Sequence, residues 1–258
     1  MNSSFAERVC ASAFLRLVSC LLSGALACTL GAAVPPDTAL WGDSHGVELA
    51  AVLGERAGAQ HRAVMQRTRG SCPPVVGYAN ARDPDCARFN AEVLQRLATT
   101  PSIRTVWLAG FWASPTYAQP GMVEKLDATI AALQAAGKRV VLVGPVPPQA
   151  FEVPRRLAHA AAFAGSEPLR GADPAETRRA TQWLSAHYAA WRARGVTVLE
   201  PLDALGRGQT SLLTLHGDPL YFDSHHLSLT GARLVLDHLC GLGGYCSVAA
   251  SSPDSRRP

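Results

Sequence analysis

The sequence has few charged residues and no concentration of charge of one sign. Only 17% of its 258 residues are charged, and the formal net charge is +4. Basic residues occur singly or in pairs such as Arg155 and Arg156, so no basic stripe predicts a nucleic-acid partner. The chain also lacks internal repeats and low-complexity blocks, and its 48% hydrophobic content excludes an intrinsically disordered protein. Its length fits one domain with a short additional segment.

Cysteines are few, and their spacing is not that of zinc ligands. Three of the seven lie in the first 28 residues, and the other four form two close pairs, Cys72 with Cys86 and Cys240 with Cys246. The gaps of 13 and 5 residues within the pairs do not match the C-x₂₋₄-C spacing of zinc knuckles, so no metal site is predicted. Each close pair instead predicts a disulfide, and therefore an oxidising compartment.

The N-terminal segment is apolar and follows a basic start. Arg8 and Arg16 precede an apolar run from Leu17 to Val34, about 18 residues long, which is just enough to span a bilayer and slightly long for the core of a signal peptide. Residues 1–33 are therefore predicted to be a signal peptide or a membrane anchor, and to make the chain's only membrane contact. Cleavage and retention both remain open, as does lipidation at Ala27-Cys28.

The rest of the chain has the pattern of an α/β domain, predicted over residues 34–247 and followed by a flexible polar tail at 248–258. Short β-branched and aliphatic runs alternate with longer segments of helical period, which predicts a mainly parallel sheet. The five predicted strands are Thr38–Gly42, Ala63–Arg67, Arg104–Ala109, Arg139–Gly144 and Val196–Glu200. Asp173 caps one predicted helix, which ends at Gly195, and the last helix begins near Ser228.

A long proline-rich segment, residues 145–172, separates the fourth strand from Asp173 and has no clear period. Loops of this length in compact α/β domains are often lids or binding loops. The segment is therefore a candidate for substrate contact, although a plain surface insertion fits equally well.

Two motifs near opposite ends of the chain carry the candidate chemistry. The first is "WGDSH", in which Ser44 follows the first strand and precedes a helix, at the sheet edge where α/β folds bind ligands. The second is "YFDSHHLSLTGA", in which Asp223 and His226 are three residues apart, so that the carboxylate can orient the imidazole. The predicted roles are nucleophile for Ser44, base for His226 and orienting acid for Asp223.

Neighbouring residues have simpler interpretations. Ser44 alone could be no more than a helix N-cap. Asp43 is expected to accept backbone N–H bonds rather than to act as a second acid. His45 is expected to line the pocket, and His225 competes with His226 for the role of base.

These motifs resemble the SGNH (GDSL-like) hydrolase superfamily, and more closely the SGNH domain fused to acyltransferase-3 membrane proteins of bacteria. The resemblance rests on residues 41–45, 71–97, 105–112 and 219–232. It implies a flavodoxin-like three-layer α/β/α sandwich and the Ser44, His226 and Asp223 triad, with no cofactor. The pattern places the base directly before Leu-Ser, which favours His226 over His225.

The sequence departs from the superfamily where Gly-x-Asn-Asp would follow the third strand. Here "LAGFWAS" puts Trp112 near the place of the asparagine, so the usual side-chain donor to the oxyanion is missing. The oxyanion hole is then predicted to consist of the backbone N–H groups of Ser44 and Gly77.

The resemblance implies an exported serine esterase or O-acyltransferase in the periplasm or cell envelope. The expected substrate is an acylated envelope glycan or a small acyl ester, with O-acetyl as the typical group. A transferase would need a separate membrane acyltransferase as partner. The alternative is a catalytically weak or inactive glycan-binding partner of such a membrane protein.

Overall fold

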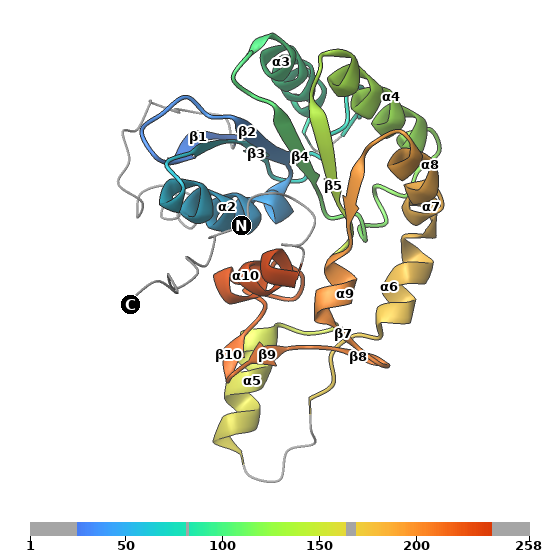
Figure 1. Ribbon diagram of the computed structural model, residues 1–258. Helices are drawn as coiled ribbons and strands as arrows, with labels where there is room; N and C mark the ends of the chain where they lie inside the picture. The colour runs from blue at the N-terminus through green and yellow to red at the C-terminus, as the bar shows by residue number, and fades with distance from the viewer. Residues whose placement is uncertain (1–24, 81–82, 164–168, 239–258) are drawn as a thin grey trace, which may run out of the picture.

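The computed structural model describes residues 25–80, 83–163 and 169–238, which form an α/β fold around a six-stranded sheet (Figure 1). The strand order is β1-β3-β2-β4-β5-β6, and all neighbours are parallel except β1 and β3. The strands are β1 (Ala25–Gly31), β2 (Thr38–Gly42), β3 (Ala63–Arg69), β4 (Thr105–Ala109), β5 (Arg139–Val143) and β6 (Thr197–Leu199). The predicted α/β class with a mainly parallel sheet is confirmed.

The sheet has one strand more than the five predicted, and the additional strand lies in the predicted leader. β1 pairs antiparallel with the outer edge of β3, with Ala25 opposite Arg69 and Gly31 opposite Ala63. Its apolar composition suits an edge strand as well as a leader, which is why composition alone did not separate the two. The cleavage site stays a prediction, but a cut after residue 33 would remove this strand. Residues 1–24 and the predicted tail at 248–258 lie outside the described ranges.

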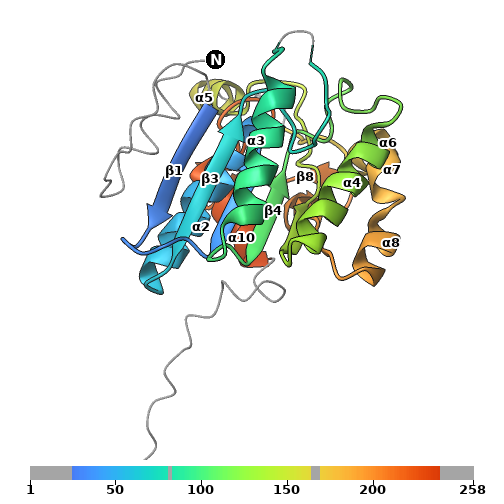
Figure 2. The same ribbon diagram turned by 90° about the horizontal axis from the view of Figure 1, so that it is seen from above.

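Helices cover both faces of the sheet, as the two views show (Figures 1 and 2). Side chains of β2 alternate between the faces, so that Leu40 belongs to one hydrophobic cluster and Trp41 to the other. The cluster of Leu40 contains residues of α2 (Val47–Ala59), α9 (Pro201–Leu205) and α10 (Leu229–His238). The cluster of Trp41 contains residues of α3 (Cys86–Thr99), α4 (Met122–Ala135), α7 (Gln182–Ser185) and α8 (Tyr188–Ala193). These are the three layers that the resemblance implied. Within the described ranges, no helix combines the length and the hydropathy needed to cross a bilayer.

Two predicted segments differ in detail from the structure. Residues 145–172 are not wholly irregular, because they include α5 (Val153–Ala162). The single helix predicted between Asp173 and Gly195 is divided into α6 (Pro174–Ala180), α7 and α8. Asp173 does cap α6, with its carboxylate accepting the N–H of Ala175 at 2.8 Å. The short hairpin strands β7 (Gly206–Arg207), β8 (Thr210–Ser211), β9 (Thr214–Leu215) and β10 (Asp218–Pro219) connect α9 to the loop before α10.

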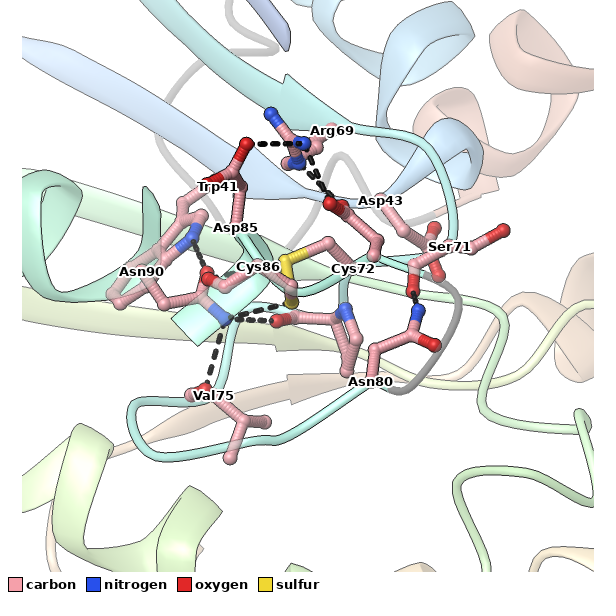
Figure 3. Close-up of a disulfide and its surroundings, with 12 residues drawn as sticks. Trp41, Asp43, Arg69, Ser71, Cys72, Val75, Asn80, Asp85, Cys86 and Asn90 are labelled. Atoms are coloured by element: carbon pink, nitrogen blue, oxygen red, sulfur yellow. Dashed lines mark hydrogen bonds and ion pairs between the residues drawn. A yellow bond between two sulfur atoms is a disulfide. The ribbon is translucent and has the colours of Figure 1, made fainter. Parts of the chain in front are cut away.

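A disulfide joins Cys72 to Cys86, the pairing that the sequence predicts, and connects the loop after β3 to the start of α3 (Figure 3). Asn90 from α3 supports this loop, donating to the carbonyl oxygens of Pro73 and Val75 at 2.9 Å each. The Asn90 side chain also accepts a 3.0 Å hydrogen bond from the indole of Trp41 in β2. The loop is thereby attached to the strand that leads to the GDSH motif. The predicted Cys240–Cys246 pair lies outside the described residues.

Candidate functional site

Ser44 lies where β2 ends at the switch point of the sheet, because β3 and β4 lie on opposite sides of β2. The strand stops at Gly42, and Asp43 caps a short 3-10 turn, η1 (Ser44–Gly46), which leads directly into α2. A side chain at Gly42 would collide with the carbonyl oxygen of Ala109 in β4, so the close approach of the two strands requires glycine. Ser44 therefore stands at the carboxyl edge of the parallel strands, as the sequence predicts.

Asp223 and His226 lie in the loop before α10 and meet Ser44 across 182 residues of sequence. Asp223 Oδ2 lies 2.7 Å from His226 Nδ1, and His226 Nε2 lies 2.8 Å from Ser44 Oγ. Asp223 Oδ1 also accepts the backbone N–H groups of His225 at 2.8 Å and His226 at 2.7 Å. The carboxylate thus fixes both the loop and the ring. The proton on Nδ1 leaves the Nε2 lone pair for the serine hydroxyl.

The loop that carries Asp223 and His226 is closed by its own backbone bonds. Phe222 N–H donates to the carbonyl of His226 at 2.8 Å, and Ser228 caps α10 by accepting the N–H of Gly231 at 3.1 Å. The long segment predicted as a binding loop reaches this place too. Gln149 N–H donates to the carbonyl of Ser224 at 2.6 Å. The base is therefore held by a network rather than by one contact.

The charges of the site favour an ionised acid and a basic imidazole. Burial alone would raise the pKa of Asp223, but the hydrogen bonds from the His226 ring and two N–H groups lower it well below 3.8. Burial lowers the pKa of His226, whereas the bond to Asp223 and the nearby charge of Glu48 raise it, and the net shift is upward from 6.5. The imidazolium that forms during acyl transfer is thus stabilised.

Asp43 has the structural role that its position predicts. Its fully buried carboxylate accepts the N–H of His45 at 2.8 Å, the N–H of Phe111 at 2.7 Å and the hydroxyl of Tyr117 at 2.9 Å. Burial raises the pKa of Asp43, and these three hydrogen bonds partly offset the rise. Asp43 thereby joins the nucleophile turn to the loop after β4.

Of the two predicted oxyanion donors, the N–H groups of Ser44 and Gly77, the structure supports the first. In the described part of the chain, the backbone N–H of Ser44 donates no hydrogen bond and can serve a ligand. Trp112 cannot replace the missing asparagine, because its ring is fully buried and its N–H donates to Val143 O at 2.7 Å. Gly77 lies in an exposed turn with φ of 75° and makes no hydrogen bond to the triad, so its role stays a prediction.

Sequence reasoning expected His45 to line the pocket and His225 to compete for the role of base, but it missed their pairing and it missed Phe111 and Glu48 beside the triad. His45 and His225 form a pair, with His45 Nε2 3.0 Å from His225 Nδ1, and the Phe111 ring stacks on both at 4.5 Å. Glu48, one turn after Ser44, is only 4% exposed, and burial raises its pKa to about 7. Glu48 lies four residues after Ser44, about one helical turn, so the sequence alone indicates that the two side chains are close. The histidine pair offered no such indication, because its members are 180 residues apart.

Comparisons with solved structures found proteins that are similar to this chain. The periplasmic domain of a lipopolysaccharide acetyltransferase from Salmonella ser. Paratyphi A superposes with a TM-score of 0.65 at 17% identity, over 80% of this chain and 83% of that one. The crystal structure of TesA covers 78% of this chain and 94% of its own, with a TM-score of 0.49 and 14% identity. No curated protein sequence matches the chain.

The family comparison covers nearly the whole domain. The matching model is described as an SGNH domain fused to AT3 domains, and it spans residues 16–239, including both motifs and β1. The TM-score of 0.65 shows that the chain shares the fold of that periplasmic domain. The chain belongs to the family of SGNH domains that are fused to AT3 domains.

Proposed function

We propose that the protein is an exported serine esterase or O-acyltransferase that acts on O-acyl groups, typically O-acetyl, of a cell-envelope glycan. The observation that carries the proposal is the continuous chain of contacts from Asp223 through His226 to Ser44, with distances of 2.7 and 2.8 Å. A nucleophile, its base and an orienting acid within hydrogen-bond distance constitute the arrangement that acyl transfer requires.

The first half of the reaction forms an acyl-enzyme. Ser44 Oγ attacks the ester carbonyl while His226 Nε2 takes its proton, giving a tetrahedral intermediate and an imidazolium. The imidazolium then gives that proton to the departing alkoxide of the donor, and the acyl group remains on Ser44. Asp223 stays ionised throughout, in keeping with its lowered pKa.

The second half transfers the acyl group to an acceptor. His226 removes a proton from water or from a sugar hydroxyl, whose oxygen attacks the acyl-enzyme, and then returns the proton to Ser44. The same residues therefore perform hydrolysis and transfer, and the acceptor decides between them. Ser44 N–H, and in this proposal Gly77 N–H, would bind the oxyanion. With no side-chain donor, turnover is expected to be slower by about 10²–10³ than with a complete hole.

Two findings support the proposed substrate and compartment. The structural neighbour at TM-score 0.65 is a periplasmic domain of a lipopolysaccharide acetyltransferase, and the family is one whose members are fused to AT3 domains. The Cys72–Cys86 disulfide suits an oxidising compartment outside the cytoplasm. A membrane acyltransferase would then be the donor or partner for the transfer reaction.

A fluorophosphonate probe tests the proposal directly, because it reacts with an activated serine and not with a passive one. We expect the wild-type protein to be labelled at Ser44, and Ser44→Ala to lose the label. Ser102→Ala, outside the site, is the matched control and should be labelled like wild type. A wild type that stays unlabelled while it binds O-acetylated glycan would replace this proposal with the glycan-binding alternative.

The products then identify the acceptor. The enzyme is incubated with an acetyl ester in the presence and absence of a deacetylated glycan, and free acetate is compared with glycan-bound acetate. An esterase gives free acetate under both conditions. A transferase acetylates the glycan at the expense of free acetate.

A further inference from the structure

Three imidazole rings meet beside Ser44, and only that of His226 has a part in the proposed reaction. The rings of His45 and His225 are nearly parallel, with an interplanar angle of 5°, and one nitrogen of each lies 3.0 Å from the other. The His226 ring lies against both, with centroid distances of 4.7 Å to His45 and 4.2 Å to His225. One ring nitrogen from each histidine lies within 4.8 Å of the other two.

The surroundings of the three rings are acidic. The carboxyl groups that act on them electrostatically are those of Asp43, Glu48, Asp223 and Glu152. Asp223, whose pKa is held well below its usual range, is ionised and carries a negative charge beside the rings. The cluster thus combines two imidazoles that burial keeps neutral with an ionised carboxylate beside the third.

We propose that His45, His225 and His226 bind a Zn²⁺ ion, and that the bound ion switches the enzyme off. Histidine nitrogen is a preferred ligand of zinc, and three protein ligands with a fourth position for water form a common coordination set. The inhibition rests on the proposed function, because the ion takes His226 Nε2, the atom that activates Ser44.

The ligand geometry is close to what the ion needs. Zinc–nitrogen bonds of about 2.0–2.1 Å place two tetrahedral ligands about 3.3 Å apart. His45 and His225 already present nitrogens at 3.0 Å, and a turn of each ring by about 40° directs both lone pairs toward one point. The proton of the bond between them moves to the far nitrogen of its ring, which leaves both ligands neutral. His226 then turns its Nε2 away from Ser44 to complete the site.

Asp223 would stabilise the metal-bound state as well as the catalytic one. A histidine that ligates zinc usually donates its other N–H to a carboxylate, which fixes the ring and raises its basicity. His226 has this partner already, in Asp223 Oδ2 at 2.7 Å from Nδ1. The contact that orients a catalytic base therefore also prepares a zinc ligand.

The test uses the untagged protein after dialysis against EDTA and then against buffer that contains no EDTA. Calorimetric titration with ZnCl₂ is expected to give a site with one ion per chain, and MgCl₂ is expected to give none. His225→Ala should weaken this site by more than about tenfold, since it removes a ligand. His159→Ala, an exposed histidine in α5, is the matched control and should titrate like wild type.

The activity arm measures hydrolysis of an acetyl ester at rising Zn²⁺, with each variant compared with its own rate without metal. Wild type should be inhibited at the concentrations that saturate the site, and EDTA should restore its rate. His225→Ala should resist the same concentrations. If no variant hydrolyses the ester, the proposed function fails while the titration still decides the metal site. Equal Zn²⁺ affinity in wild type and His225→Ala, or saturation without inhibition of an active enzyme, would overturn the inference.

Discussion

The hydroxyl of Tyr117 donates a 2.9 Å hydrogen bond to Asp43 Oδ2, and so connects the loop after β4 to the turn that presents Ser44. Both side chains are buried, and the same carboxylate oxygen accepts the N–H of Phe111 at 2.7 Å. The nucleophile is therefore positioned by a contact between elements that are 74 residues apart.

Tyr117→Phe removes that one bond and leaves the ring in place. We expect a loss of about 1–2 kcal/mol in the free energy of unfolding, which urea denaturation measures, and a smaller kcat for ester hydrolysis. Tyr188→Phe is the matched control, because the Tyr188 hydroxyl is buried without a hydrogen-bond partner in the described residues. If the two variants lose equal stability, the Tyr117–Asp43 bond does not have the role given to it.

The triad variants divide the chemistry among three residues. Ser44→Ala removes the acyl acceptor and His226→Ala removes the base, so each should abolish acetate release from an acetyl ester. Asp223→Asn should lower kcat by about 10⁴, the loss recorded for the corresponding change in serine proteases, because it changes the tautomer of the base.

His225→Ala should cost less than His226→Ala, since the His225 ring contacts neither Ser44 nor Asp223 through a hydrogen bond. The rates are compared under single-turnover conditions, so that product release does not mask them. Full activity in Ser44→Ala would remove the serine mechanism. Greater loss in His225→Ala than in His226→Ala would reverse the assignment of the base.

The pH profile follows from the raised pKa of His226. Only the neutral imidazole can accept the serine proton, so kcat/KM should rise through a pH above 6.5 and then level off. In Asp223→Asn the charge and the charge-assisted bond that raise this pKa are absent, so the acid limb should move to lower pH as the plateau falls. The profiles are measured in buffers that contain EDTA. An acid limb that does not move in Asp223→Asn would mean that Asp223 does not set the basicity of His226.

The sequence predicted the triad because its three members lie in two short motifs at a strand end and before a helix. It could not predict β1, whose apolar residues have the composition of a leader, and only the pairing of Gly31 with Ala63 identifies a strand. The sequence could not predict the role of Tyr117 either. Its contact with Asp43 exists because β4 lies beside β2, and no local pattern near Tyr117 carries that information.

The disulfide prediction concerns stability. Cys72 and Cys86 are 14 residues apart, and a loop of about 15 residues closed by a disulfide contributes about 3 kcal/mol. The double variant Cys72→Ser and Cys86→Ser should lose roughly that amount in urea denaturation. Wild type in dithiothreitol should lose a similar amount, whereas the double variant should respond much less to the reductant. Equal responses of the two proteins would mean that this disulfide does not contribute to stability.

Glu48 makes the fold less stable at neutral pH and above than at acidic pH. The residue is only 4% exposed, and burial raises the pKa of its carboxyl group from 4.5 to about 7, although the charge of His226 partly offsets the shift. The folded state therefore holds this proton more tightly than the unfolded state does. Stability is complete below about pH 4.5 and falls as the pH rises toward 7, where the buried carboxyl must ionise.

Glu48→Gln keeps the size of the side chain and removes the ionisation. A rise in pKa from 4.5 to about 7 corresponds to about 3 kcal/mol, so at pH 8 the variant should be more stable than wild type by up to that amount. At pH 4.5 the two proteins should unfold at the same urea concentration. Glu55→Gln is the matched control, because Glu55 lies on the same helix, is half exposed and pairs with Arg233 at 2.9 Å. It should give no comparable gain at pH 8. A Glu48→Gln variant that gains nothing between pH 4.5 and 8 would show that Glu48 ionises in the folded protein as easily as in the unfolded chain.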